Sequence, residues 1–305
     1  MKQVLALLAL AAAAVAMTVS PAAAAPHAAQ AGCAAVSFNS VDVLKASVAS
    51  SIQKEPAITE TTATLPESAK GKGGAKFRAS VPVWFHVISP DGKTGNVTQA
   101  QIDDQMLALN RGFAGFYGGA NSKISFSLAG VTRTTNADWF NAGIGSNAER
   151  DMKRTLHRGG WGTLNVYSST AEAYLGWAFL PGLPESRQYM DGIVFDWESM
   201  VHTSTRYLNK YDLGFTLVHE AGHWFGLEHT FFGGCNDKGD FVDDTPAQRY
   251  PSSGCPVGND TCPDKPGLDP IHNFMDYSYD SCYFEFTAGQ VLRMQDHWLF
   301  FRNGK

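Results

Sequence analysis

Three histidines and a glutamate lie close together in the run TLVHEAGHWFGLEHT, which begins at Thr216. His219 and His223 are four positions apart, so on a helix their imidazoles lie on one face and can bind the same metal ion. Neutral imidazoles are ligands that suit zinc. Glu220 follows the first histidine, where its carboxylate can take a proton from a water molecule beside the ion. The pattern predicts a hydrolytic metal site.

A third ligand requires the chain to leave the helix, and Gly226 stands where it can do so. Glycine permits the left-handed conformation that ends a helix sharply, after which the chain can turn and bring His229 back to the ion. Three protein ligands leave one position open for water, as in catalytic rather than structural zinc sites. The alternative is a half-buried helix with solvated histidines, and the glycine that ends the predicted helix argues against it.

A methionine and a tyrosine follow downstream, Met275 and Tyr277 in the run NFMDY. The histidine pattern, extended by Gly226 and His229 and followed by a methionine turn, is the signature of metzincin metalloproteases. Met275 would form an apolar floor under the metal, because a thioether fills such gaps well. The Tyr277 hydroxyl could donate a hydrogen bond to the developing oxyanion. Without the histidines upstream, both would be interpreted as ordinary core residues.

The segments around this site alternate between predicted strands and predicted helices. The site helix has an apolar stripe that would bury it, and Asp212 is expected to cap its start. The alternation favours an α/β (α+β) fold, in which a twisted mixed sheet is backed by helices. The predicted strands are residues 81–88, 124–131, 164–167, 174–180 and 193–195, and the other predicted helices are residues 97–116 and 148–156.

Residues 1–25 have the layout of a secretory signal peptide. Met1 and Lys2 supply a positive end, residues 4–17 form an apolar run, and residues 22–25 are small residues that suit cleavage. A membrane-spanning helix needs ~20 apolar residues, and no later segment of the sequence is long and apolar enough. We therefore expect a secreted, extracellular protein without a membrane span.

Residues 26–75 differ in composition from the rest of the chain. They are rich in Ala, Ser and Thr and poor in aromatic residues, and they end in a Gly- and Lys-rich stretch that is expected to be flexible. We interpret them as a pro-segment or disordered spacer and residues 76–305 as the metalloprotease catalytic domain. The net charge of -5 and the pI near 6.0 do not indicate nucleic-acid binding. We expect a monomer.

Four of the five cysteines cluster in the last quarter of the chain, and Cys33 is left over. In the oxidising compartment expected for an exported chain, such a cluster favours two disulfides. Four cysteines allow three pairings, and their spacing alone does not choose among them. The clustered cysteines are Cys235, Cys255, Cys262 and Cys282.

Three blocks of sequence together resemble the pappalysin (cytophagalysin) family of metzincins. They are HEAGHWFGLEHTF, then DDTPAQ at 243–248, then NFMDYSYDSCYFEFTAGQ at 273–290. The resemblance implies a secreted zinc endopeptidase, with the active-site helix in an α/β upper half and an irregular lower half stapled by disulfides.

By position, the resemblance also implies a role for each site residue. His219, His223 and His229 would bind zinc, Glu220 would act as general base, and Tyr277 would lie beside the metal above the Met275 turn. Where the family has disulfides, it suggests the pairs Cys235–Cys262 and Cys255–Cys282, each of which would restrict the unfolded state of the irregular region.

Two weaker hypotheses concern latency and calcium. Cys33 could be a latency switch whose thiolate occupies the open zinc position, or it could be an idle or intermolecular thiol. Four aspartates after the zinc motif could bind calcium or form a solvated acidic loop. These aspartates are Asp237, Asp240, Asp243 and Asp244.

The sequence favours a zinc endopeptidase that hydrolyses extracellular proteins or peptides. Residues 174–180 could supply an edge strand that pairs with an extended substrate, or they could be an ordinary core strand. The alternative function is a secreted zinc-bound binding or adhesion module without catalysis, which would have no need of the Glu220 carboxylate. A third possibility, a zinc amidase, is disfavoured by the blocks around Met275.

Overall fold

The computed structural model describes residues 64–172, 174–236 and 238–305. The predicted signal peptide, most of the predicted pro-segment, Cys33 and Asp237 lie outside the described residues. Within them, no helix is long and apolar enough to cross a membrane.

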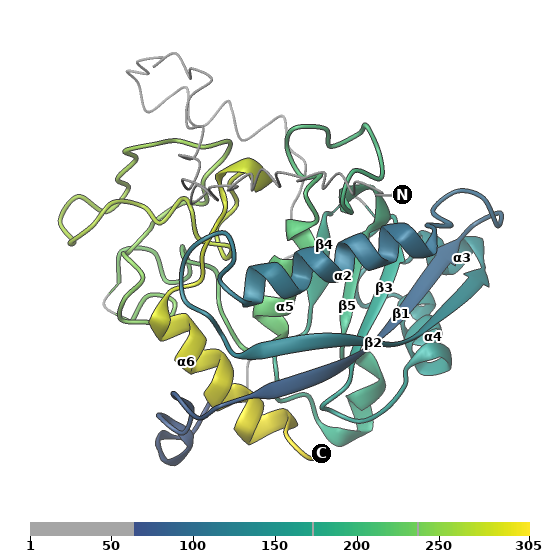
Figure 1. Cartoon of the computed structure of the whole chain (residues 1–305), viewed down its shortest axis with the longest axis horizontal. Coiled ribbons are helices and arrows are strands. Elements are labelled where there is room, and N and C mark those ends of the chain that lie inside the picture. Colours follow the sequence, from purple (N-terminus) through teal and green to yellow (C-terminus); the bar gives the residue numbers. More distant parts are fainter. Residues whose placement is uncertain (1–63, 173, 237) are drawn as a thin grey trace, which may run out of the picture. The chain divides into compact units, whose positions relative to one another are not determined.

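A five-stranded mixed sheet forms the centre of the described unit (Figure 1). Its order is β2-β1-β3-β5-β4, in which β1 is parallel to β2 and β3, β3 is parallel to β5, and β4 is antiparallel to β5. The strands are β1 (Ala79–Ser89), β2 (Ile124–Thr135), β3 (Leu164–Ser169), β4 (Gly176–Ala178) and β5 (Ile193–Asp196). The predicted mixed sheet is thereby confirmed, although β4 is shorter than the segment expected.

Helices pack on both faces of this sheet, as Figure 1 shows. On one face, α2 (Gln99–Phe113) and α5 (Phe215–Trp224) share one apolar core with alternate residues of β1, including Val81, Val83 and Phe85. On the other face, α4 (Asn147–Leu156) buries Met152 and Leu156 against β3 and β4, beside α3 (Ala137–Phe140). The remaining helices are α6 (Ala288–His297), the short 3-10 helices η1 (Glu67–Ala69), η2 (Glu185–Met190), η3 (Trp197–Ser199) and η4 (Asp280–Cys282), and the π-helical turn η5 (Trp298–Arg302).

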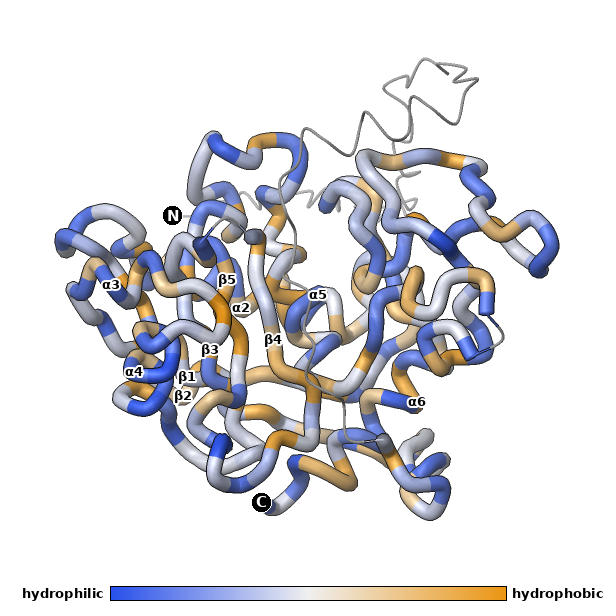
Figure 2. Tube along the Cα trace, turned by 180° about the vertical axis from the view of Figure 1, so that it is seen from behind, coloured by the Kyte–Doolittle hydropathy of each residue, from blue (hydrophilic) through white to orange (hydrophobic). Residues whose placement is uncertain are grey.

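The region between α5 and α6 is irregular and is stapled by two disulfides. Cys235 is bonded to Cys262, and Cys255 is bonded to Cys282. This confirms the pairing that the family resemblance suggested. The second disulfide fixes η4, whose Asp280 contacts the start of the site helix. Polar and apolar residues are mixed along the chain between α5 and α6 (Figure 2).

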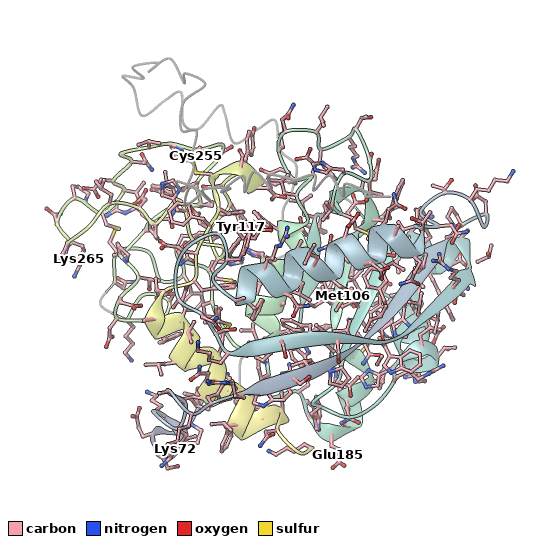
Figure 3. All side chains as sticks on the ribbon, viewed as in Figure 1. Lys72, Met106, Tyr117, Glu185, Cys255 and Lys265 are labelled. Atoms are coloured by element: carbon pink, nitrogen blue, oxygen red, sulfur yellow. A yellow bond between two sulfur atoms is a disulfide. The ribbon has the colours of Figure 1, made fainter. Side chains whose placement is uncertain are left out.

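Residues 71–74, which belong to the stretch expected to be a flexible linker, are bound to α6 instead. The backbone N–H groups of Gly71, Lys72 and Gly73 donate to the Asp296 carboxylate at 2.6, 2.7 and 2.8 Å. Gly74 N–H donates to the Gln295 side chain at 2.6 Å. Figure 3 shows Lys72 beside the end of α6. The composition of this stretch indicated flexibility. In the structure, three of its backbone N–H groups are bound by the carboxylate of Asp296, which is distant in sequence but adjacent in space.

A buried ion pair holds β4 in place from the α4 side of the sheet. The Lys153 ammonium lies 2.9 Å from the Glu149 carboxylate, and neither side chain is exposed. The Trp177 indole N–H, from β4, donates to the same carboxylate at 2.8 Å. Burial would raise the pKa of Glu149, but the Lys153 charge and the Trp177 hydrogen bond outweigh it, so the pKa lies below its ordinary value.

Replacing Lys153 with methionine should destabilise the fold, because it leaves the Glu149 carboxylate buried without its cation. We expect the free energy of unfolding to fall by about 3–5 kcal/mol in urea titrations. Lys93→Met, at an exposed position, is the control and should change little. A loss for Lys153→Met as small as that of the control would contradict this account.

Replacing Asp296 with alanine should release residues 71–74 from α6, since three N–H groups lose their acceptor. The expected loss in unfolding free energy is about 1–3 kcal/mol, together with faster proteolytic cleavage at Lys72. Asp104→Ala, at an exposed position of α2, provides the comparison. Equal stability and equal cleavage rates in the two variants would show that the contact does not anchor this segment.

Candidate metal centre and active site

Three imidazole nitrogens converge at the C-terminal half of α5. His223 Nε2 lies 3.2 Å from His219 Nε2 and 3.1 Å from His229 Nε2. All three ligand atoms lie within 4.8 Å of one another. Zinc–nitrogen bonds of ~2.0–2.1 Å at tetrahedral angles place ligand nitrogens about 3.3 Å apart. The donor set and its spacing therefore fit a zinc ion.

Backbone carbonyl groups fix the tautomers of the two helical histidines. His219 Nδ1 donates to the Phe274 carbonyl oxygen, and His223 Nδ1 donates to the Leu227 carbonyl oxygen at 2.7 Å. A carbonyl oxygen only accepts hydrogen bonds, so each Nδ1 carries the proton. Each Nε2 is then left with its lone pair directed at the common point, as metal-ligating histidines require.

Gly226 makes the turn that the sequence predicted. Its φ is +92°, a left-handed conformation that favours glycine. A Cβ at this position would also collide with the ring of His297 on α6. The Gly226 N–H donates to the His223 carbonyl at 2.8 Å, and its own carbonyl accepts from Arg293 Nε at 2.8 Å. The turn that returns His229 to the site is therefore held by α6.

The start of α5 differs from the prediction, because Asp212 is not its cap. The N-cap is Gly214, with φ +78° and no side-chain hydrogen bond. Asp280, from η4, accepts from the backbone N–H of Leu213 at 2.9 Å and of Phe215 at 3.4 Å. The Asp212 carboxylate accepts from the Asn209 N–H instead. A capping rule based on neighbouring residues does not detect an acceptor so distant in sequence.

Glu220 is buried between α5 and β4, with 1% of its surface exposed. Gly176 of β4 lies so close that a Cβ there would be 2.8 Å from Glu220 Oε1. Glu220 is not part of the metal-binding group, as expected for a residue that is not a ligand. A small pocket opens beside it, lined by residues that include Thr216, Tyr277 and Asp280.

Met275 and Tyr277 both lie against residues of the candidate metal site. Met275 is fully buried, and its sulfur packs against Gly222, on the α5 turn between His219 and His223. The Tyr277 ring lies beside the metal-binding group, with its centroid 5.8 Å from that of His219 and 4.9 Å from that of His229. The role of Met275 as a floor under the metal and that of the Tyr277 hydroxyl stay predictions.

Known proteins share these features with the chain. The sequence model of the M43 peptidase family, which is described as pregnancy-associated plasma protein-A, matches residues 163–298. An extracellular metalloprotease of Neurospora crassa is 41% identical over 254 residues, which make up 81% of this chain and 84% of that protein. Another, from Pyricularia oryzae, is 43% identical and covers 74% of this chain and 77% of that protein. The chain belongs to the pappalysin family.

A solved structure supports the assignment of the chain to the pappalysin family. The structure of Tannerella forsythia mature mirolysin in complex with a cleaved peptide matches with a TM-score of 0.62 and 27% sequence identity. The match covers 72% of this chain and 92% of that one. The resemblance stated from sequence is confirmed, and the pappalysin is a secreted zinc-dependent protease that acts on protein substrates.

Two of the four aspartates of the predicted calcium site, Asp240 and Asp244, accept hydrogen bonds from neighbouring residues of the pappalysin. Asp240 accepts from the Val242 N–H and the Thr245 hydroxyl, and burial raises its pKa to about 6. Asp244 accepts from Thr287 and Gly289 at the start of α6. Among the described residues, these carboxylates do not form a group that could hold a metal ion. Calcium binding stays a prediction that nothing in this geometry favours.

Replacing Gly226 with alanine should weaken metal binding, because both the positive φ and the His297 contact oppose a side chain. We expect about 1–3 kcal/mol of lost unfolding free energy and a lower metal content after dialysis. Gly258 is a matched control, with φ +81° and open space around it. Gly258→Ala should keep its metal, and equal metal contents in the two variants would refute the role given to the turn.

Proposed function

We propose that His219, His223 and His229 hold one zinc ion and that the protein is an endopeptidase. The observation that carries this proposal is the convergence of the three Nε2 atoms beside a buried carboxylate and an edge strand. When bound, zinc would polarise the scissile carbonyl group and lower the pKa of a water molecule to ~7.

Glu220 would move the proton of the reaction. Its carboxylate accepts a proton from the attacking water and then delivers it to the amine nitrogen of the departing product, as a general base and then a general acid. Its burial against Gly176 supports this role, because the side chain is held in one place next to the strand. The Tyr277 hydroxyl would donate a hydrogen bond to the oxygen on which negative charge develops.

The strand β4 would bind the substrate. It is the terminal strand of the sheet order and lies beside α5, as Figures 1 and 2 both show. An extended peptide can add to such an edge through backbone hydrogen bonds. Trp177 belongs to the core on the opposite face and is anchored by Glu149, so the strand is held in place while Gly176 lies against Glu220. Binding through backbone groups favours cleavage within a chain.

We propose the following route to the active protein. Residues 1–25 direct export and are removed, and a pro-segment that starts at residue 26 is removed afterwards. The sequence places the start of the catalytic domain at residue 76, and the burial of Leu65 and Ala69 with the contacts of residues 71–74 supports adding residues 65–75 to that domain. The role of Cys33 in latency and the monomeric state remain predictions.

Glu220→Gln should abolish proteolysis while leaving the metal in place. The amide has nearly the same shape but cannot accept the proton, so kcat/KM on casein-derived peptides should fall ~10²–10⁴-fold. Removing zinc with a chelator should abolish the activity of the wild type, and adding zinc back should restore it. Glu185→Gln, at an exposed position, is the control.

A zinc-loaded Glu220→Gln protein that cleaves like the wild type would contradict the role given to Glu220. A zinc-loaded, N-terminally processed wild type that cleaves no protein would contradict the endopeptidase assignment and support a binding module.

A further inference from the structure

The ring of Phe231 contacts two members of the site that α5 does not carry. It stacks on His229, with centroids 4.7 Å apart and planes inclined by 9°. It also meets Tyr277 edge to face, with centroids 4.9 Å apart and an angle of 70°. His229 and Tyr277 are themselves 4.9 Å apart, so the three rings form a closed cluster.

We propose that Phe231 is a positioning residue for the reaction, which sets the orientation of the His229 imidazole and of the Tyr277 ring together. The proposal rests on the proposed function, because it assumes that His229 binds zinc and that Tyr277 acts on the substrate. Phe231 ends the first of the blocks that carry the family resemblance, but no role for it follows from the sequence, since one aromatic residue after a zinc motif looks like any core residue.

The three histidines differ in how the chain holds them. His219 and His223 lie on a buried helix, and carbonyl oxygens from Phe274 and Leu227 fix their Nδ1 atoms. His229 lies beyond the Gly226 turn, on a loop, and is only half-buried. A stacked ring two residues further along that loop limits rotation of the imidazole about its own side-chain bonds.

The backbone around Phe231 is held firmly enough for its ring to act in this way. Thr230 is buried, its N–H donates to the Met275 carbonyl at 3.2 Å, and its hydroxyl donates to Gln248 at 2.7 Å. The Phe232 N–H donates to the His229 carbonyl at 2.9 Å. These bonds fix the loop to the Met275 turn, which also carries Tyr277. Phe231 therefore links two segments whose relative position determines the site.

The neighbouring Phe232 provides a matched control. Its side chain is 43% exposed, and its ring packs on Phe241, with centroids 5.6 Å apart. Within the described part of the chain its ring does not contact the rings of the metal-binding histidines or Tyr277, although it lies on the same loop one residue away. Removing this ring tests the effect of losing an aromatic residue from the loop without altering the cluster.

The test compares Phe231→Leu, Phe231→Tyr and Phe232→Leu in the N-terminally processed protein. Zinc affinity is measured by competition with a chromogenic chelator, folding by the melting temperature of the zinc-free form, and kcat and KM on a quenched peptide. We expect Phe231→Leu to bind zinc ~10–100-fold more weakly, as loss of a residue that orients a metal ligand does. At saturating zinc its kcat should fall while KM changes little.

Phe231→Tyr, which keeps the ring, should restore both properties, and Phe232→Leu should match the wild type. Tyr277→Phe keeps the ring contacts, so it should lower kcat without weakening zinc binding. Wild-type zinc affinity and kcat in Phe231→Leu would overturn the proposal. Equal losses of zinc affinity and kcat in Phe231→Leu and Phe232→Leu would also overturn it. So would a loss of zinc affinity in Phe231→Leu that is fully explained by a lower melting temperature of the zinc-free protein.

The same set of proteins separates this proposal from the proposed function. If His229→Ala binds zinc as tightly as the wild type, or if Glu220→Gln remains active, the proposed function fails. If those two variants lose zinc and activity respectively while Phe231→Leu behaves normally, only the role of Phe231 fails.

Discussion

The Nε2 atom of His223 lies 3.1–3.2 Å from those of His219 and His229, and the lone pairs of such atoms repel one another unless a cation lies between them, so the surrounding protein must hold them there. Two of these nitrogens come from consecutive turns of α5, which is buried on all its residues between the sheet and the irregular region. The third must come from outside the helix, and it needs the Gly226 turn. The depth of α5 in the fold and the sharp end of this helix are both consequences of that requirement.

The helix α6 supports this arrangement from the side away from the metal. His297 packs against Gly226, Arg293 donates to the Gly226 carbonyl, and Asp296 accepts from residues 71–73. One helix thus connects the N-terminal part of the described chain with the turn that places His229. On the opposite side, the Glu149–Lys153 pair anchors β4 beside Glu220. The position of the catalytic groups relative to the substrate strand depends on both supports.

Most of the site could be predicted from sequence, because its residues follow short-range rules. Histidines four positions apart share a helix face, and a glycine marks the helix end, whatever the rest of the fold. The features that could not be predicted depend on partners far away along the chain. Asp280, and not Asp212, accepts from the backbone at the start of α5. Asp296 binds a stretch whose composition indicated flexibility. The proposed role of Phe231 depends on its contact with Tyr277, which the sequence does not reveal.

We infer that three histidines and no other protein side chains hold one zinc ion in this pappalysin. X-ray absorption spectroscopy at the zinc edge of the purified, zinc-loaded protein would count and identify these ligands. We expect three imidazole nitrogens at ~2.0–2.1 Å, with the remaining position taken by a light oxygen atom. A scattering shell at ~2.3 Å would indicate a cysteine sulfur ligand, and that shell, or a spectrum with fewer than three imidazoles, would contradict the claim.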